Sequence, residues 1–480
     1  MIRLLAVALL LFASCTTDDD EASPPLTREQ LLNPESCKDC HPKHYREWSA
    51  SMHAYATKDP VFLAMNARGQ RETKGELGEF CVKCHAPMAV AEKKISDLSK
   101  PNEVPEHLQG VTCYFCHNAS GVGADHFNAN VTLANDNIMR AALDKPIEPS
   151  VHRVQYSEHH DPKSLKSSQL CGTCHDIKTP APANVRLERT LDEYQSSIFA
   201  VSDPMKFASC QDCHMDASKY TVPAADSTGR PGEVVQARTV HEHLWPAVDI
   251  ALTEFPHADA MRSAVESCRL RTSISYFKVN FDQGPGFPFV VTIETQAGHA
   301  QPSGAAQDRR MWLELIAYDA SDKVVYRQGE IGDGAIEETA EKHHPCMFRD
   351  RIKDASGKEV HMFWEAASYD SFVLPPTPAN GTLVPGGHSQ YCNFRPFLSS
   401  PPARIELKLR MRPMGIDVLQ DLVTSGDLAA DVVTRMPTFT VASYEARYSE
   451  ADHDFIVRET SDSDCKGYLC MLDPSAPKCQ

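Results

Sequence analysis

The sequence predicts an α + β protein with two unlike parts, a mostly helical and irregular N-terminal domain followed by a C-terminal antiparallel β-sandwich. Two observations lead to this prediction. Five copies of the pattern Cys-x-x-Cys-His lie between Cys37 and His214, and none follows. Near residue 274 the sequence changes, and short runs of apolar and β-branched residues begin to alternate with turns that contain Gly and Pro.

The five Cys-x-x-Cys-His patterns predict covalent attachment of five c-type hemes. Two thiols three positions apart can add to the two vinyl groups of one heme, and the His that follows lies under the iron as its proximal ligand. A zinc site would need paired Cys-x-x-Cys patterns or further His at set spacing. The attachment residues are Cys37, Cys40, Cys81, Cys84, Cys113, Cys116, Cys171, Cys174, Cys210 and Cys213. The proximal ligands are His41, His85, His117, His175 and His214.

The N-terminus predicts export and anchoring. An apolar run from Leu4 to Ala13 follows Arg3, which is the pattern of a signal peptide over residues 1–14, and the run is too short to span a bilayer. Cys15 after this run resembles the lipid-bearing Cys of a bacterial lipoprotein; an ordinary signal peptide with an incidental Cys is the alternative. Residues 15–35 predict a flexible tether. We therefore expect a lipid-anchored protein of the bacterial cell envelope, at the outer membrane and facing the periplasm or the cell surface.

Six of the 17 cysteines belong neither to the motifs nor to the lipid site. They are Cys268, Cys346, Cys392, Cys465, Cys470 and Cys479. Up to three disulfides suit an exported protein, but the sequence leaves their pairing open.

The net charge of −17 argues against nucleic acid as a partner. The acidity is compatible with transient docking to other redox proteins of the envelope, or it serves only to maintain solubility. The sequence does not indicate an oligomeric state.

The domain that holds the motifs is expected over residues 36–272. About 36 residues per motif cannot bury a core of their own, so the hemes must supply it. A helix is expected over Pro42–Thr57 and another over Trp245–Leu270, the latter broken near Pro256. A weak internal repeat relates the segment 47–54 to the segment 193–200, since each contains Glu, an aromatic residue and Ser at matching positions.

The β-sandwich is expected over residues 273–460, and residues 461–480 form a tail that contains Cys. Four runs predict its strands, at residues 277–281, 289–293, 312–316 and 404–409.

Three segments of the first domain resemble multiheme cytochromes of the cytochrome c-554 type, a superfamily that also includes hydroxylamine oxidoreductase-like enzymes. They are Glu47-Trp48-x-x-Ser51-x-His53-Ala54, Ser168-Gln169-Leu170-Cys171-Gly172-Thr173-Cys174-His175-Asp176 and Cys210-Gln211-Asp212-Cys213-His214-Met215. The β region resembles a module of some multiheme cytochromes through Gly298-His299-x-x-Pro302-Ser303-Gly304. This resemblance covers roughly residues 36 to 245 in the first domain.

The resemblance implies distal iron ligands at His53, at His159 or His160, at His241 or His243, and at His299. We favour His160 and His243 within the two pairs. His126 is a further candidate from its position nine residues after His117. His53 is expected to serve a different heme from His41, because twelve residues of helix span about 18 Å. Met88 is expected to pack rather than to bind iron.

Electron transfer through a chain of five hemes is the function that the sequence favours, with no catalytic residue beyond the cofactor. The alternative is a multiheme oxidoreductase acting on a small nitrogen or sulfur compound at one five-coordinate heme. A third reading gives the β domain an independent binding role, because a β-sandwich alone specifies no function. Whether any heme is five-coordinate cannot be derived from the motifs, since all five keep their His.

Overall fold

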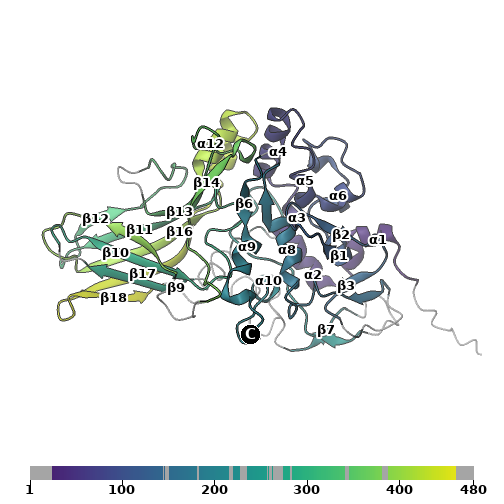
Figure 1. Ribbon diagram of the computed structural model, residues 1–480, viewed down its shortest axis with the longest axis horizontal. Coiled ribbons are helices and arrows are strands. Elements are labelled where there is room, and N and C mark those ends of the chain that lie inside the picture. The colour runs from purple at the N-terminus through teal and green to yellow at the C-terminus, as the bar shows by residue number, and fades with distance from the viewer. Residues whose placement is uncertain are drawn as a thin grey trace, which may run out of the picture.

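The computed structural model describes residues 24–143, 145, 151–180, 183–215, 220–226, 235–256, 258, 262, 274–281, 284–340, 345–380 and 388–460. The predicted signal peptide, Cys15, Cys268 and the C-terminal tail with Cys465, Cys470 and Cys479 lie outside these residues. Within them, a helical and irregular part precedes an antiparallel β part, which confirms the predicted α + β class (Figure 1).

The N-terminal part is made of short helices and two-stranded ribbons. Its helices are α1 (Arg28–Leu32), η1 (Pro34–Cys37), α2 (Pro42–Ser49), α3 (Met52–Tyr55), α4 (Pro60–Glu72), α5 (Val82–His85), α6 (Pro87–Ala91), η2 (Pro101–Glu103), η3 (Glu106–Leu108), α7 (Cys113–Asn118), α8 (Ser167–His175), α9 (Thr190–Gln195), η4 (Ile198–Ala200) and α10 (Cys210–His214). Its strands are β1 (Ala119–Val122), β2 (Val131–Leu133), β3 (Met139–Ala141), β4 (Val154–Tyr156), β5 (Asp176–Lys178), β6 (Arg186–Arg189), β7 (Val222–Pro223) and β8 (Ala237–Arg238).

The predicted helix over Pro42–Thr57 is present but is broken into α2 and α3. Ser51 causes the break, because its hydroxyl donates to the carbonyl of Trp48 and accepts from the amide of Ala54. A serine that bonds neighbouring backbone groups competes with helix continuation and favours a cap. The predicted segment is therefore divided between two helices.

The helix predicted over Trp245–Leu270, with a break near Pro256, is wrong for residues 245–256, which are not helical. Beyond the break, the described residues Ala258 and Arg262 are helical. Val248, Ile250 and Leu252 are all buried, and their spacing of two residues suits an extended segment rather than a helix. This segment runs beside the core of the β part, where the three side chains pack.

The C-terminal part contains two antiparallel sheets. Its elements are β9 (Ile274–Phe281), β10 (Phe289–Thr295), β11 (Arg310–Tyr318), β12 (Val324–Gln328), β13 (Met347–Lys353), η7 (Phe363–Glu365), β14 (Ser368–Phe372), β15 (Gln390–Phe394), β16 (Arg404–Arg412), α12 (Ile416–Thr424), α13 (Ala430–Val433), β17 (Phe439–Ser449) and β18 (Asp454–Glu459). One sheet has the order β15-β10-β9, and the other has the order β14-β13-β11-β16-β17-β18 with β12 also paired to β11. All four predicted strand runs fall inside β9, β10, β11 and β16.

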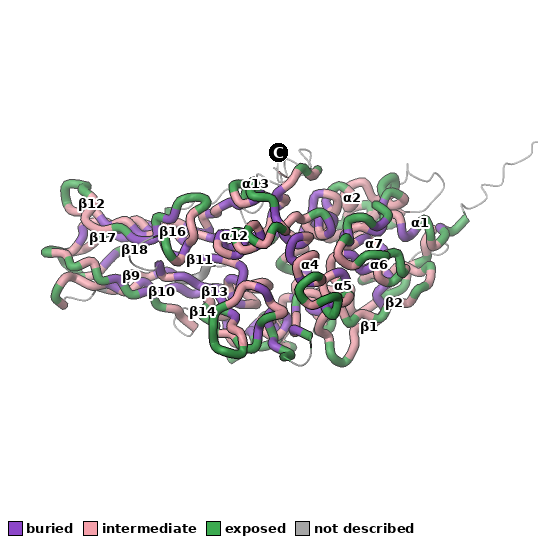
Figure 2. The backbone as a smooth tube through the Cα atoms, turned by 90° about the horizontal axis from the view of Figure 1, so that it is seen from above, coloured by how far each residue is buried: buried purple, intermediate pink, exposed green. Residues whose placement is uncertain are grey.

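One apolar core fills the space between the two sheets (Figure 2). Val291 and Ile293 of the smaller sheet share it with Leu313, Leu407 and other inward residues of the larger one. Alternate residues of each strand point inward, as the pleat requires. Each fully buried aliphatic side chain contributes about 1.5–3 kcal/mol of apolar burial.

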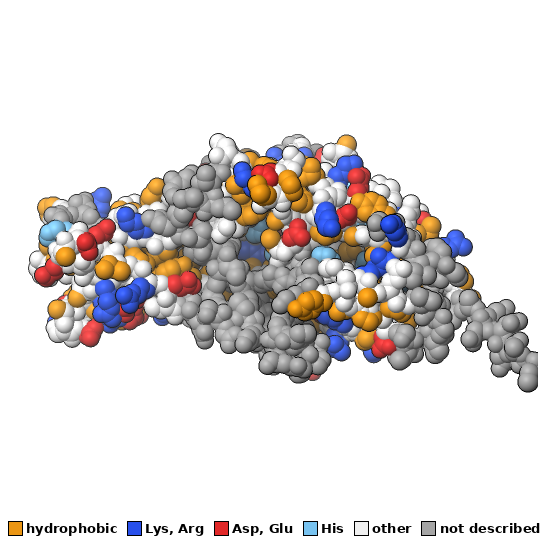
Figure 3. Space-filling model, turned by 90° about the horizontal axis from the view of Figure 1, so that it is seen from below, with side chains coloured by type: hydrophobic (Ala, Val, Ile, Leu, Met, Phe, Trp, Pro, Cys, Tyr) orange, Lys and Arg blue, Asp and Glu red, His pale blue; other side chains and the backbone are white. Residues whose placement is uncertain are grey.

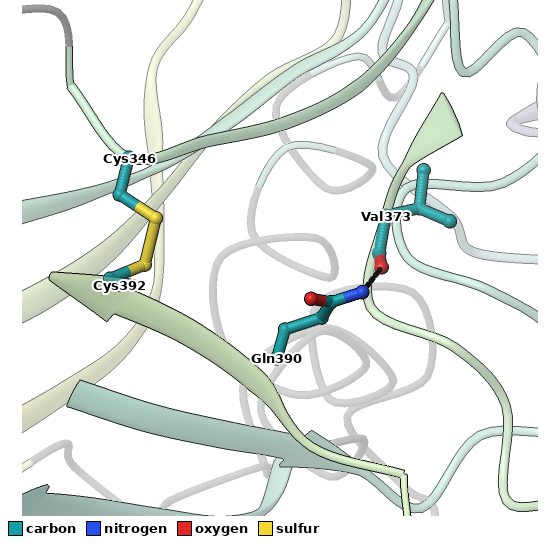
Figure 4. The surroundings of a disulfide bond; sticks show 4 residues. All are labelled: Cys346, Val373, Gln390 and Cys392. Atoms are coloured by element: carbon teal, nitrogen blue, oxygen red, sulfur yellow. Dashed lines mark hydrogen bonds between the residues drawn. A yellow bond between two sulfur atoms is a disulfide. The ribbon is translucent and has the colours of Figure 1, made fainter. Parts of the chain in front are cut away.

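A disulfide joins the two sheets at their edge (Figure 4). Cys346 precedes β13 and Cys392 lies in β15, with Cα atoms 5.7 Å apart. Beside it, the Gln390 side-chain amide donates to the Val373 carbonyl at 3.0 Å. Of the six cysteines left open by the sequence, these two are therefore paired.

The two parts are joined by more than a linker. The core of the β part extends into the N-terminal part through Val61, Ala64 and Met65 of α4. In Figure 1, α4 lies beside α12, while α9 and β6 lie at the junction of the two parts. This junction positions residues of the β part against the motif-bearing helices.

Candidate heme-binding site

Each Cys-x-x-Cys-His motif lies on or directly before a helical turn. The second to fifth motifs lie on α5, α7, α8 and α10, and the first bridges η1 and α2. Residues three and four positions apart share one face of a helix. The two thiols and the imidazole of a motif are therefore presented on the same side, as attachment to one porphyrin requires.

Burial keeps four of the motif imidazoles neutral. It lowers the pKa of His41 and of His85 to about 4, and it also lowers the pKa of His117 and of His175. Imidazole binds a metal only in its neutral form. These side chains are therefore in the metal-binding state at neutral pH.

The motif side chains line hollows within the fold. The middle residues of the fourth motif, Gly172 and Thr173, are buried, yet His175 is reachable by solvent. None of the ten attachment cysteines is fully buried. Side chains that are enclosed by protein and still accessible border open space, which fits a bound planar group.

Four motif imidazoles face a second imidazole from elsewhere in the chain. The distances between ring centres are 6.3 Å for His41 and His152, 6.4 Å for His175 and His53, 6.3 Å for His117 and His243, and 6.2 Å for His214 and His299. The angles between the ring planes are 31°, 71°, 17° and 19° in the same order.

These separations match two imidazoles on one metal ion. An imidazole nitrogen binds a first-row metal at about 2.0 Å and lies a little over 1 Å from its ring centre, so two rings on opposite sides of one ion have centres about 6.3 Å apart. All four observed distances lie close to this value. The donor set thus fits heme iron with His on both faces.

Backbone carbonyls orient several of these rings. His41 Nδ1 lies 3.1 Å from the Ala224 carbonyl and His117 Nδ1 lies 2.7 Å from the Arg140 carbonyl. In the facing imidazoles, Nδ1 of His243 lies 3.0 Å from the His241 carbonyl, and Nδ1 of His299 lies 2.9 Å from the Ala300 carbonyl. An Nδ1–H that donates to a carbonyl leaves Nε2 unprotonated and free to bind metal.

Four sequence candidates do not belong to these pairs. His160 approaches His117 with ring centres 5.7 Å apart, but its Nε2 already meets the Cys116 carbonyl at 2.8 Å. His126 Nε2 lies 2.9 Å from the buried carboxylate of Asp176 and does not face a motif imidazole. His159 and His241, the alternatives of the two pairs, have Nδ1 against the carbonyls of Lys166 and Met215.

His152 was missed by sequence reasoning. It pairs with His41 from the segment before β4, where no motif or periodicity marks it. Only the fold brings the two residues together, since 111 positions separate them in the sequence. Met88 is fully buried in an apolar cluster with Tyr114 and Leu108, as expected for a packing residue.

His85 differs from the other four motif histidines. Its Nδ1 lies 3.1 Å from the Ala56 carbonyl, and its ring stacks on Phe62 at 3.8 Å with the planes 4° apart. Among the residues that the structure describes, no imidazole stands opposite it at the spacing of the other pairs.

Comparison with known proteins supports the same chemistry. A family model described as "Cytochrome c554 and c-prime" matches residues 36–118, which contain the first three motifs. The fold is similar to that of a penta-heme cytochrome c552 from Thermochromatium tepidum, with a TM-score of 0.56 and 20% identity over 87% of this chain and 98% of that one. No curated protein matches. Over its first three motifs and in its fold, the chain is thus similar to multiheme c-type cytochromes. These similarities support heme c as its cofactor and heme-based electron transfer as its chemistry.

The attachment cysteines of this cytochrome meet across motifs. Hydrogen bonding to Cys113 lowers the pKa of Cys37, bonding to Cys84 lowers that of Cys174, and bonding to Cys171 lowers that of Cys210. Motif 1 therefore adjoins motif 3, motif 2 adjoins motif 4, and motif 4 adjoins motif 5. Cys116 of motif 3 also interacts electrostatically with both cysteines of motif 4.

The two residues between the cysteines are both buried in motifs 3 and 4, whereas at least one of them is exposed in motifs 1, 2 and 5. Tyr114 and Phe115 within motif 3 are buried, like the matching residues of motif 4. Lys38, Asp39 and Lys83 within motifs 1 and 2 are exposed, and Cys213 of motif 5 is the exposed member of the ten. The described residues include no helix long and apolar enough to cross a membrane.

Proposed function

We propose that this cytochrome relays electrons through five covalently bound hemes at the bacterial cell envelope. The four imidazole pairs at 6.2–6.4 Å are the main support for this proposal. Iron with an imidazole on each face has no position left for a substrate, which suits electron transfer rather than catalysis. The ligand pairs proposed here are His41 with His152, His117 with His243, His175 with His53, and His214 with His299.

The cytochrome's own residues hold this arrangement in place. Each bound heme supplies a one-electron iron couple whose potential depends on its axial ligands and surroundings. The cysteines fix each porphyrin to a helical turn, and the carbonyls of Ala224 and Arg140 fix two proximal rings. Burial lowers the pKa of His41 and of His117, so protonation does not compete with iron at these two rings at neutral pH.

Contacts between motifs suggest the path of the electrons. Motif 1 adjoins motif 3, motif 3 adjoins motif 4, and motif 4 adjoins motif 5, while motif 2 branches from motif 4. The exposure of Lys38 and Asp39 at motif 1 and of Cys213 at motif 5 supports ends of this path at the surface. Redox partners therefore dock at Lys38–Asp39 on one end and near Cys213 on the other.

A second candidate function is supported by His85 alone. If the iron above His85 keeps one open position, it can bind a small nitrogen or sulfur compound and accept or donate electrons through motif 4. The same protein is then an oxidoreductase with a four-heme relay. Addition of nitrite or cyanide to the oxidised protein separates the two functions, because only an open iron changes its spectrum.

The His299→Ala variant tests the relay through the β part. Removal of this imidazole should convert one low-spin heme to high-spin, since the ring stands 6.2 Å from His214. Electron paramagnetic resonance (EPR) of the oxidised protein measures this conversion. His453→Ala, a change of an exposed His in the same part, serves as the matched control and should leave the spectrum unchanged. An unaltered spectrum in His299→Ala would remove His299 from the ligand set.

We also propose that lipid on Cys15 anchors the cytochrome at the outer membrane, with the tether 15–35 between lipid and fold. The Leu4–Ala13 run and the Cys that follows it support this location. Cys15→Ser should release the protein from washed membranes into the soluble fraction. Membrane association that persists in this variant would contradict anchoring through Cys15.

A further inference from the structure

Two segments of the N-terminal part share one backbone design. At the end of α2 and of α9, the capping amide bonds to carbonyls of the last turn, and a serine follows. Ser51 has φ −86° and ψ 159°, and Ser197 has φ −86° and ψ 162°. Each serine side chain then accepts from an amide of the next short helix. The weak sequence repeat is thus a structural repeat.

The glutamate at the start of each copy bonds to the backbone of a loop that bears a distal imidazole. Glu47 Oε2 accepts from the His243 amide at 2.9 Å. Glu193 Oε2 accepts from the Ala300 amide, next to His299, at 3.0 Å and from the Ser303 hydroxyl at 2.7 Å. Both carboxylates are largely enclosed, with 5% of the Glu47 side chain and 15% of the Glu193 side chain exposed.

The hydrogen bonds from Glu47 and Glu193 fix the position of each loop, which the hydrogen bonds of the imidazoles do not. Within each loop, Nδ1 of His243 or His299 is held by a carbonyl of its own loop, so the ring turns with that loop. The position of the loop against the motif helices must then be set by a contact from outside it. A carboxylate that accepts from a backbone amide supplies such a contact and is stronger than a neutral acceptor.

We propose that Glu47 and Glu193 are equivalent positioning residues, each of which holds one distal imidazole at binding distance from its motif histidine. Glu47 positions His243 opposite His117, and Glu193 positions His299 opposite His214. This inference rests on the proposed function, because it requires both imidazoles to bind iron. It assigns the repeated glutamate a role that the neighbouring serine and aromatic residues do not share.

The two copies differ in how many bonds support them. The loop after His299 is also joined to α9 through Thr190, whose hydroxyl lies 2.9 Å from the Ser303 hydroxyl and accepts from the Gly304 amide at 3.1 Å. These bonds remain when Glu193 is removed. The effect of a substitution should therefore be larger at Glu47 than at Glu193.

The test compares four variants of the full-length, heme-loaded protein: Glu47→Ala, Glu47→Gln, Glu193→Ala and Glu193→Gln. Each is measured by EPR of the oxidised state and by heme content, beside His243→Ala and His299→Ala as references for the two hemes. His243→Ala and His299→Ala each identify one low-spin heme signal by removing it. Glu47→Ala should shift the His243 signal or convert part of it to high-spin, and should leave the His299 signal unchanged. Glu193→Ala should change the His299 signal and leave the His243 signal unchanged, so each variant is the matched control of the other.

The Gln variants should restore most of each signal, because Gln retains an acceptor oxygen for the amide. Glu450→Ala, at an exposed position, should change neither signal. If Glu47→Ala yields no heme-loaded protein, Glu47→Asp shortens the side chain and tests the same contact.

The outcomes separate the two proposals. Unchanged spectra in His243→Ala and His299→Ala would overturn the proposed ligands themselves. Normal loss of signal in those variants, with unchanged signals in Glu47→Ala and Glu193→Ala, would overturn the positioning role alone. A fall in melting temperature without a shift of the matching heme signal would also overturn it.

Discussion

At the residue scale, burial sets the protonation state of the His53 and His243 imidazoles. Burial lowers the pKa of His53 to about 3, and the ring faces His175. Burial also takes the pKa of His243 well below its ordinary value. Each pKa unit corresponds to about 1.4 kcal/mol between the two protonation states, so both rings stay neutral far below neutral pH.

His152 provides the residue-scale prediction. His152→Ala should convert the heme of motif 1 to high-spin, because this ring is the one that stands 6.3 Å from His41. His160→Ala should convert none, since His160 Nε2 is engaged by the Cys116 carbonyl. EPR of the oxidised variants measures both. A high-spin heme in His160→Ala, with none in His152→Ala, would show that His160 binds iron and that His152 does not.

The residues that could be predicted from the sequence are those fixed by local chemistry. The motif cysteines and histidines are set by the attachment reaction, so five residues of sequence define each site. The distal residues are set by tertiary structure, and His243 and His299 were expected only through the resemblance to c-554-type cytochromes. No local pattern marks His152, or the pairing of His126 with Asp176, because the two residues of each pair are far apart in the sequence.

At the scale of elements, short-range patterns predicted the strands better than the helices. The β11 and β16 runs alternate between the core and the outside, and this period is visible in the sequence. The segment after Trp245 has an apolar content that suits either a helix or an extended chain. Its extended form follows from docking against the β core, which no local signal reveals.

A charged network joins α4 of the N-terminal part to α12 of the β part. His361 lies 3.3 Å from a carboxylate oxygen of Asp417 and 3.1 Å from one of Asp421. Asp421 also accepts from Arg68 of α4 at 3.0 Å. Hydrogen bonding and the charge of Asp417, followed by those of Asp421, raise the pKa of His361 above its ordinary value.

This raised pKa predicts a pH dependence. Because the folded state binds the His361 proton more tightly than the unfolded state, its contribution is complete below about pH 6.5 and is lost as the pH rises through the higher folded value. The melting temperature should therefore fall across this range, and His361→Gln should remove much of that dependence. Calorimetry of both proteins at several pH values is the measurement. Parallel profiles would contradict this role for His361.

At the scale of the whole molecule, the β part completes the heme-bearing part rather than standing beside it. His299 faces motif 5, Asp350 pairs with Arg189 at 2.8 Å, and α4 shares the β core. An independent binding module would not need this junction. On the face shown in Figure 3, acidic and basic side chains are mixed over the β part, with no single basic patch.

The arrangement of the motifs also exists only at this scale. Motifs follow one another in the sequence as 1 to 5, yet the thiol contacts connect 1 to 3 and 2 to 4. In the proposed relay, the order of electron transfer would therefore differ from the order along the chain. The sequence predicts how many hemes attach, and the fold decides which ones are neighbours.

The proposed relay is tested most directly by EPR of the fully oxidised protein together with its heme content. We expect five hemes per chain, of which at least four are low-spin. Three should have nearly parallel imidazole planes, and the heme of motif 4 should show the more anisotropic signal of strongly inclined planes, since His53 and His175 are inclined by 71°. Two or more high-spin hemes, or fewer than five hemes, would contradict a relay built on these imidazole pairs.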